Sequence, residues 1–124
     1  MKMTKEELAA KLEAHAKWLK TRYTDHVEGE RADLTDADLT GADLTDADLT
    51  RADLTCANLT DADLTDADLT RADLTRANLT DANLTRANLE HVWRASQLVW
   101  DAISATLSAR IALKKTRIEF EQNK

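Results

Sequence analysis

The hydrophobic and polar positions between Ala32 and His91 follow one five-residue unit that occurs twelve times without interruption. Each unit reads Ala-Asp/Asn-Leu-Thr-X; alanine and leucine never vary, and threonine is replaced only at Glu90. In an α-helix of about 3.6 residues per turn, these leucines would advance by roughly 140° and leave no apolar face. In one continuous strand, a spacing of five would send successive leucines to opposite faces. The pattern therefore excludes both regular elements.

A short extended segment followed by a corner in every unit satisfies the pattern. Alanine and leucine lie two residues apart and point to the same side, and the corner at Thr-X turns the next pair toward the same axis. The chain then forms a β-solenoid with alanine and leucine inside and Asp, Thr and X outside. The sequence predicts an all-β solenoid core over residues 32–91, with helical caps over residues 1–31 and 92–124.

The units ADLTD, ADLTR and ANLTD resemble the pentapeptide-repeat family, and the twelve copies cover 60 of the 124 residues. The resemblance implies a right-handed quadrilateral β-helix with four units per coil and three coils, about 15 Å tall at the usual strand spacing. The repeat count itself leaves three or four units per coil open. A coil of 20 residues aligns Arg31, Arg51, Arg71 and His91 in one column, whereas a coil of 15 residues mixes arginine with aspartate. This alignment favours four sides.

The N-terminal segment carries the signals of an α-helix over roughly residues 4–22. Thr4 and Glu7 have the spacing of a capping box, and an apolar stripe then runs from Leu8 to Tyr23 at helical spacing. The helix is expected to cover the first coil because solenoids need capped ends. Val27 and Gly29 are expected to fill the Ala and Leu positions of a degenerate half-unit. The candidate packing residues of the cap are Leu8, Leu12, His15, Trp18 and Leu19.

The C-terminal segment predicts a second α-helix, from His91 to about Lys115, because it contains strong helix formers and no breaker. Its 24 residues would span about 36 Å, which exceeds the end of a slim β-helix. Two exposed tryptophans on a free helix would form an apolar patch that needs a cover. We therefore predict a homodimer, with a folded-back monomer and binding to another protein as alternatives. The predicted interface residues are Trp93, Trp100, Ile103, Leu107 and Ile111.

Charge is segregated along the chain, since residues 28–91 carry 16 acidic residues and 5 arginines while both ends are mildly basic. An acidic surface argues against nucleic acid as a partner and leaves a basic protein as a candidate partner. The sequence has no run of about 18 apolar residues and begins with a charged segment rather than an apolar signal region. These features predict a cytoplasmic protein with no membrane partner.

No constellation of residues in the sequence points to catalysis or to a cofactor. The predicted interior is alanine and leucine, no nucleophile stands beside a base, and no P-loop or dinucleotide fingerprint is present. His15, His26 and His91 have the spacing of packing, loop and corner residues rather than of metal ligands. Cys56 falls at an outward X position, as an incidental thiol. We therefore expect no enzyme, no cofactor and no metal site.

Stacked aspartates such as Asp33, Asp53 and Asp73 should repel one another, so other groups must offset this repulsion. Like charges about 4 Å apart cost on the order of 1 kcal/mol even in water. Threonine hydroxyls, backbone N–H groups and the arginine column are the candidate partners that would relieve them. A calcium ladder is a weaker alternative, because the units lack the glycine-rich ligand loops of calcium-binding repeats.

Two classes of function fit these features. The first is a non-enzymatic structural or interaction scaffold. The uniformity of the repeats is compatible with a recent duplication and with a consensus-designed or idealised sequence of the family. The second follows from the resemblance: some family members are acidic rods that mimic duplex DNA and bind DNA gyrase. Those rods are much longer than three coils, which favours the scaffold.

Overall fold

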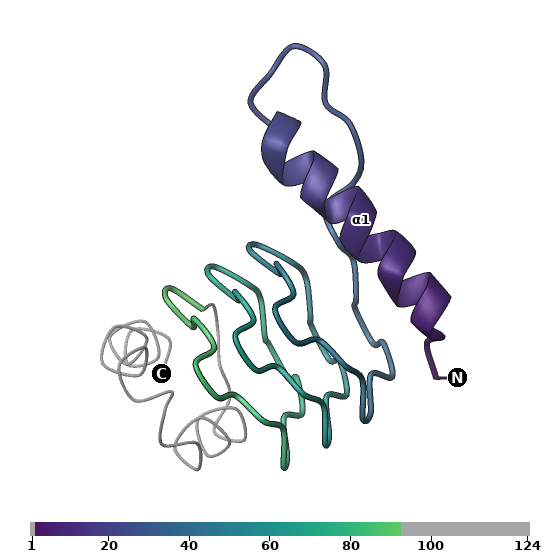
Figure 1. Cartoon of the computed structure of the whole chain (residues 1–124), viewed down its shortest axis with the longest axis vertical. Coiled ribbons are helices and arrows are strands. Elements are labelled where there is room, and N and C mark those ends of the chain that lie inside the picture. The colour runs from purple at the N-terminus through teal and green to yellow at the C-terminus, as the bar shows by residue number, and fades with distance from the viewer. Residues whose placement is uncertain (1, 93–124) are drawn as a thin grey trace.

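The computed structural model describes residues 2–92, and Figure 1 shows their arrangement. Within these residues there is one helix, α1 (Lys5–Thr21), and a loop that leads from it into the repeats. The repeats stack as successive turns of the chain, and α1 lies across the end at which the first repeats begin (Figure 1). The predicted C-terminal helix and its interface residues lie outside the described residues.

The predicted capping box at the start of α1 is confirmed. Thr4 N–H donates to Glu7 Oε2 at 2.8 Å, and Glu7 N–H donates back to Thr4 Oγ1 at 3.1 Å. At the other end, Arg22 is the C-cap and its N–H donates to the carbonyl of Trp18 at 2.8 Å. The apolar stripe therefore stops before Tyr23, whose side chain is 82% exposed because it follows the last helical turn. Its expected place in the stripe is wrong.

The loop after α1 does not form the expected half-unit, since Val27 is 56% exposed. Gly29 instead lies against the helix with φ +73°, and the next residue, Glu30, donates its N–H to the carbonyl oxygen of Ala14 at 3.2 Å. A Cβ on Gly29 would lie 2.1 Å from that oxygen. Glycine is required here by the close approach of two backbones.

Parallel bridges join units that are 20 residues apart, so four units make one turn rather than three. Within residues 2–92 no continuous strand forms, and the Asp or Asn of each unit takes part in isolated bridges instead. The expected extended segment Ala-Asp-Leu is thus reduced to one ladder residue per unit. The bridges are Asp33–Asp53–Asp73, Asp38–Asn58–Asn78, Asp43–Asp63–Asn83 and Asp48–Asp68–Asn88.

Every backbone N–H of an interior unit has a partner. Two N–H groups donate to one neighbouring turn of the chain, one donates to the other neighbour, one closes the corner and one binds a side chain. In unit 62–66 they donate in order to Leu59 O (3.0 Å), Ala42 O (2.9 Å), Asn83 O (2.7 Å), Asp63 Oδ1 (3.0 Å) and Thr85 O (2.9 Å). This complete pairing allows a structure without long strands to persist.

The core is a column of leucines lined by alanines. All twelve repeat leucines are at most 1% exposed, and each contributes about 1.5–3 kcal/mol through burial. Nine of the twelve repeat alanines are also buried, but Ala37, Ala42 and Ala47 near α1 are only partly buried. The interior of the repeats is therefore packed, and the less tightly covered part of the core faces the helix.

The fifth residue of every unit has a left-handed backbone, with φ between +55° and +68°. Gly41 is the glycine among them; the other eleven positions hold Asp, Arg, Cys or His. This conformation lets the chain turn the corner, and it disfavours L-residues other than Asn and Asp. The sequence pattern did not indicate it, because the position tolerates several residue types.

Candidate functional site

The junction between α1 and the first repeats is where the regular hydrogen bonding of the stack has to be replaced. The first turn of the repeats has no preceding turn, so its outer backbone groups need other partners. Lys2 forms a parallel bridge with Asp38, and Met3 N–H donates to the carbonyl of Asp38 at 3.1 Å. One turn further along, Leu39 donates in the same way to Asn58 at 2.8 Å. Met3 thus takes the place of a leucine in the missing turn.

His15 performs a similar replacement with its side chain. The imidazole is fully buried; its Nε2 lies 2.8 Å from the carbonyl oxygen of Thr50, and Ala32 N–H donates to its Nδ1 at 2.9 Å. Both bonds form together only when the ring is neutral and carries its hydrogen on Nε2. In the next turn, the corresponding threonine carbonyl, that of Thr70, accepts from a backbone N–H instead, that of Arg51 at 2.9 Å.

Burial holds the pKa of His15 below its ordinary value. The hydrogen bond to Thr50 and the charge of Asp48 act in the opposite direction, while Arg31 and Arg22 reinforce the lowering. Trp18 stacks on the ring, with centroids 5.7 Å apart and planes 17° apart. The neutral form is therefore supported by both the solvent exclusion and the hydrogen-bond geometry.

The five predicted cap residues occupy different environments. Leu8 is buried in the core cluster, Leu12 is partly buried against it, and His15 joins the repeats by its two hydrogen bonds. Trp18 is half-buried on His15, and Leu19 is half-buried outside the apolar cluster. Sequence reasoning missed Met3, which packs against the core. Its position just before the N-cap Thr4, five residues before Leu8, is that of a hydrophobic staple and could have revealed it.

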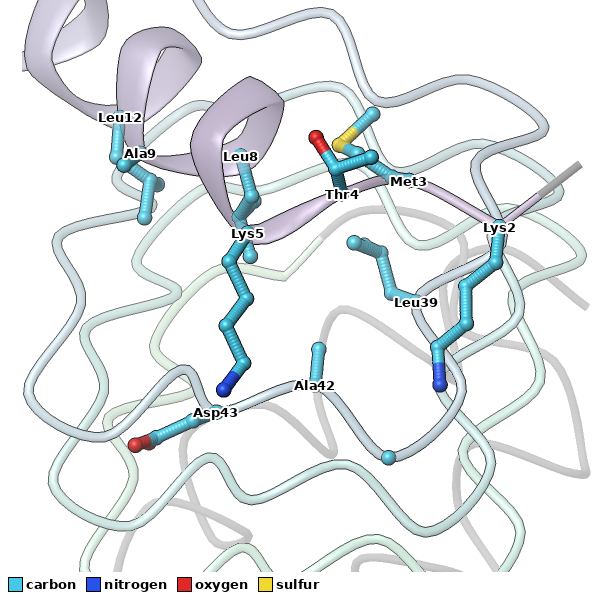
Figure 2. Close-up of a pocket in the computed structure, with 11 residues that line it drawn as sticks. Lys2, Met3, Thr4, Lys5, Leu8, Ala9, Leu12, Leu39, Ala42 and Asp43 are labelled. Carbon is cyan, nitrogen blue, oxygen red and sulfur yellow. The ribbon is translucent and has the colours of Figure 1, made fainter.

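A cavity of about 420 Å³ lies between the start of α1 and the first repeats. Figure 2 shows its apolar lining from both sides, with Leu8 on the helix and Leu39 and Ala42 on the repeats. Lys2 and Lys5 stand at its rim, and the side chain of Lys5 extends toward Asp43 (Figure 2). The cavity thus combines an apolar lining with the amino groups of Lys2 and Lys5 and the carboxylate of Asp43.

The ladder carboxylates are engaged in local turns. Asp38 Oδ1 accepts the N–H of Thr40 at 3.1 Å and its hydroxyl at 2.6 Å. Asn58 makes the same two contacts with Thr60, at 3.1 and 2.6 Å. Asp and Asn are therefore interchangeable as acceptors, which explains why the second position admits only these two residues.

These turns also answer how the stacked charges are relieved. The threonine hydroxyl, and then its N–H, holds the pKa of Asp38 and that of Asp43 below the usual value. The arginine column contributes less, since Arg31 approaches Asp53 only at 4.0 Å. Arg86, in another column, forms the two-pronged pair, with bonds of 2.7 and 3.0 Å to Asp66. For Asp38 and Asp43, the threonine is therefore the main partner among the candidates that the sequence offered.

The remaining candidates from the sequence are dispersed. His26 is exposed in the loop after α1, while His91 and the half-buried Cys56 occupy left-handed corners. Across the described part of the chain, no group of three or more His, Cys, Asp or Glu residues could hold a metal ion. In the same part, no helix has the length and apolar character needed to cross a bilayer.

The parallel ladders with a 20-residue period define a β-solenoid repeat protein. The family described as "Pentapeptide repeats (8 copies)" matches residues 32–71 and 57–92. The chain therefore belongs to the pentapeptide-repeat family through residues 32–92, as the sequence predicted. Comparison with curated proteins gives no match.

Solved structures of the same family resemble the chain. A pentapeptide-repeat protein from the thylakoid lumen of Arabidopsis thaliana is 42% identical, with a TM-score of 0.51 over 53% of this chain and 46% of its own. The protein Rfr23 from the cyanobacterium Cyanothece 51142 is 40% identical, with a TM-score of 0.44 over 44% of this chain and 37% of its own. The alignments thus span less than half the length of these two proteins.

Proposed function

We propose that this chain is a non-enzymatic scaffold that presents an acidic repeat surface to a basic protein. Pentapeptide-repeat proteins are typically structural scaffolds. The observation that carries the proposal is the filled leucine column, in which every repeat leucine is at most 1% exposed, so recognition falls to the outer surface. That surface belongs to a segment with 16 acidic residues and 5 arginines, which would attract positive charge.

The architecture proposed for this scaffold is a right-handed quadrilateral β-helix of three coils, capped by α1 and by a C-terminal helix. The 20-residue bridges over residues 33–88 support the coil length. At the start of the repeats, Met3 and His15 replace absent backbone partners, which supports a helical cap at this end. Such ends would otherwise be open to edge-to-edge association.

A second part of the proposal is dimerisation through the C-terminal segment, which lies outside the described residues. The apolar stripe of Trp93, Trp100 and Leu107 supports it, since an uncovered patch of this kind favours self-association. Light scattering of the full chain tests it. The wild type is expected to have twice the monomer mass, and Trp93→Ala/Trp100→Ala the monomer mass.

Tyr23→Ala provides the matched control for that experiment, because it truncates an exposed aromatic ring at the opposite end of the repeats. This variant is expected to keep the mass of the wild type. A monomeric wild type would contradict dimerisation without affecting the scaffold proposal. A dimer that survives both tryptophan substitutions would place the interface elsewhere.

The alternative is an acidic DNA mimic that binds DNA gyrase. The acidic segment supports it, but a height of about 15 Å spans only four or five base-pair steps of about 3.4 Å per subunit. A supercoiling assay with purified gyrase separates the two functions. Inhibition at micromolar protein would favour the mimic, and unchanged supercoiling would exclude it.

A further inference from the structure

A cleft of about 550 Å³ beside the C-terminal end of α1 gathers positive charge on an otherwise acidic molecule. Its lining consists of Trp18, Arg22, Tyr23, Arg31 and Arg51, with no acidic residue among them. Arg31 and Arg51 lie 20 residues apart, in the register of the Asp33–Asp53 bridge, so they stand one above the other. Three arginines from two different segments therefore converge on one opening.

The charge in this cleft is poorly compensated. Between residues 2 and 92, the ion pairs are Lys17–Glu13, Arg86–Asp66 and Arg31–Asp53, the last at 4.0 Å. Arg22 and Arg51 take part in none of them. Arginines that share a cleft repel one another, and an anion held between them would remove that repulsion.

Aromatic contacts hold Arg22 in place. Its guanidinium carbon lies 5.2 Å from the ring centroid of Trp18 and 4.6 Å from that of Tyr23. Its Nε atom is shielded from solvent and has no hydrogen-bond partner in the described part of the chain. The guanidinium lies over both rings, and its Nη donors, in contrast to the shielded Nε, face the cleft that an oxyanion would enter.

The aromatic residues add a second requirement for the ligand. Tyr23 is 82% exposed although it holds Arg22, so much of its ring surface can receive another planar group. The cleft is wide and open to solvent, so a ligand would lie on its surface rather than be enclosed by it. Several arginines favour a dianion over a single carboxylate, since each guanidinium can share its charge with one oxygen pair.

We propose that the cleft formed by Trp18, Arg22, Tyr23, Arg31 and Arg51 binds a small phosphate ester that carries a planar ring. The arginines bind the phosphate group and Tyr23 stacks on the ring. This site is independent of the scaffold function and of dimerisation, because it lies at the helix-capped end and uses only residues of one chain.

Calorimetric titration of the full chain with three probes tests the site. Adenosine 5′-monophosphate is expected to bind in the micromolar to low millimolar range, inorganic phosphate at least fivefold more weakly, and adenosine not detectably. Absence of binding by both phosphate-containing probes at 10 mM would overturn the proposal. Equal affinity for inorganic phosphate and the nucleotide would refute the proposed stacking of Tyr23 on the ring of the ligand.

Matched variants locate the site. Arg51→Gln and Arg22→Gln are each expected to weaken nucleotide binding at least tenfold. Arg76→Gln is the control, since Arg76 occupies the same left-handed corner position as Arg51 but lies outside the cleft. An equal loss in Arg76→Gln would show attraction by general charge only and would refute the site.

Tyr23→Ser is a second test of the site, because Arg22 is the C-cap of α1 and Arg22→Gln can alter the end of the helix. The exposed ring can be removed without touching the core, so the fold is expected to persist. This variant should weaken binding of the nucleotide at least fivefold and binding of inorganic phosphate by clearly less, since Arg22 loses its contact with Tyr23 but keeps the one with Trp18. A nucleotide affinity equal to that of the wild type would refute stacking on Tyr23.

Discussion

His15 Nε2 lies 2.8 Å from the carbonyl oxygen of Thr50, across 35 residues of sequence, where the next turn of the stack has a backbone N–H. A side chain of α1 thereby completes the hydrogen bonding of the first repeats. Its second nitrogen accepts from Ala32 N–H at 2.9 Å, so one ring connects the start and the end of the first turn. The stability of the capped end should depend on the charge state of this ring.

The first prediction is that the protein loses stability as the pH falls below about 6.5. The pKa of buried His15 is lowered in the folded chain from its ordinary value of 6.5. The unfolded chain then binds a proton that the folded chain does not, so the free energy of unfolding falls by at most about 1.4 kcal/mol per pH unit in this window. Above pH 6.5 the full stabilisation is present.

Urea unfolding at pH 7.5 and pH 5.5 measures this effect. His15→Gln leaves Thr50 O or Ala32 N–H without its partner, so it should be less stable at pH 7.5 by about 1–3 kcal/mol. The variant should also lose the dependence of stability on pH below about 6.5. His26→Gln is the control, because His26 is exposed. The ladder carboxylates do not interfere, since the pKa values of Asp38 and Asp43 are lowered from 3.8 and their contribution is lost only at more acidic pH. The same pH dependence in His15→Gln would contradict the assignment.

The second prediction separates the two roles of a ladder aspartate. Asp53 bridges to Asp33 and Asp73, and its Oδ1 accepts Thr55 N–H at 3.0 Å and the Thr55 hydroxyl at 2.6 Å. Asp53→Asn keeps the acceptor, removes a like charge and gives up the 4.0 Å ion pair with Arg31, so its free energy of unfolding should change by no more than about 0.5 kcal/mol. Asp53→Ala loses the acceptor and should cost about 1–2 kcal/mol. Denaturant unfolding of both variants checks this; an equal loss would mean that the charge matters more than the turn.

The third prediction concerns salt. The aspartates of one column repeat at the ladder spacing of about 4.8 Å, which is well inside the screening length of about 10 Å at 0.1 M salt. Added sodium chloride should therefore raise the melting temperature by reducing self-repulsion. Asp53→Asn, which interrupts the column Asp33–Asp53–Asp73, should respond less than the wild type. A melting temperature unchanged between 0.02 and 0.5 M salt would refute self-repulsion.

The fourth prediction compares two glycines with nearly the same φ angle. Gly41 (φ +68°) has open space around an added Cβ, whereas a Cβ on Gly29 (φ +73°) would lie 2.1 Å from Ala14 O. Gly41→Ala should cost about 1 kcal/mol from backbone strain alone. Gly29→Ala should cost clearly more, since the loop must also move away from α1. Thermal unfolding of both variants measures the difference, and equal losses would show that the loop shifts without cost.

Residues 32–91 determined the solenoid by themselves, because a period of five satisfies inward alanine and leucine only if every unit turns a corner. The capping box of Thr4 and Glu7 was equally local, since its two bonds join residues three positions apart. The spacing of Arg31, Arg51 and Arg71 along the chain also favoured the four-sided coil, because only a 20-residue register keeps them in one column.

The tertiary structure alone decided which groups replace the missing turn and where positive charge gathers. His15 meets Thr50 and Ala32 only when α1 docks on the repeats, and Arg22 shares a cleft with Arg51 for the same reason. The exposure of Tyr23 and Val27 depended on where the helix ended and how the loop returned. Repetition specifies local geometry in each unit, whereas contacts between unlike segments depend on how those segments meet in space.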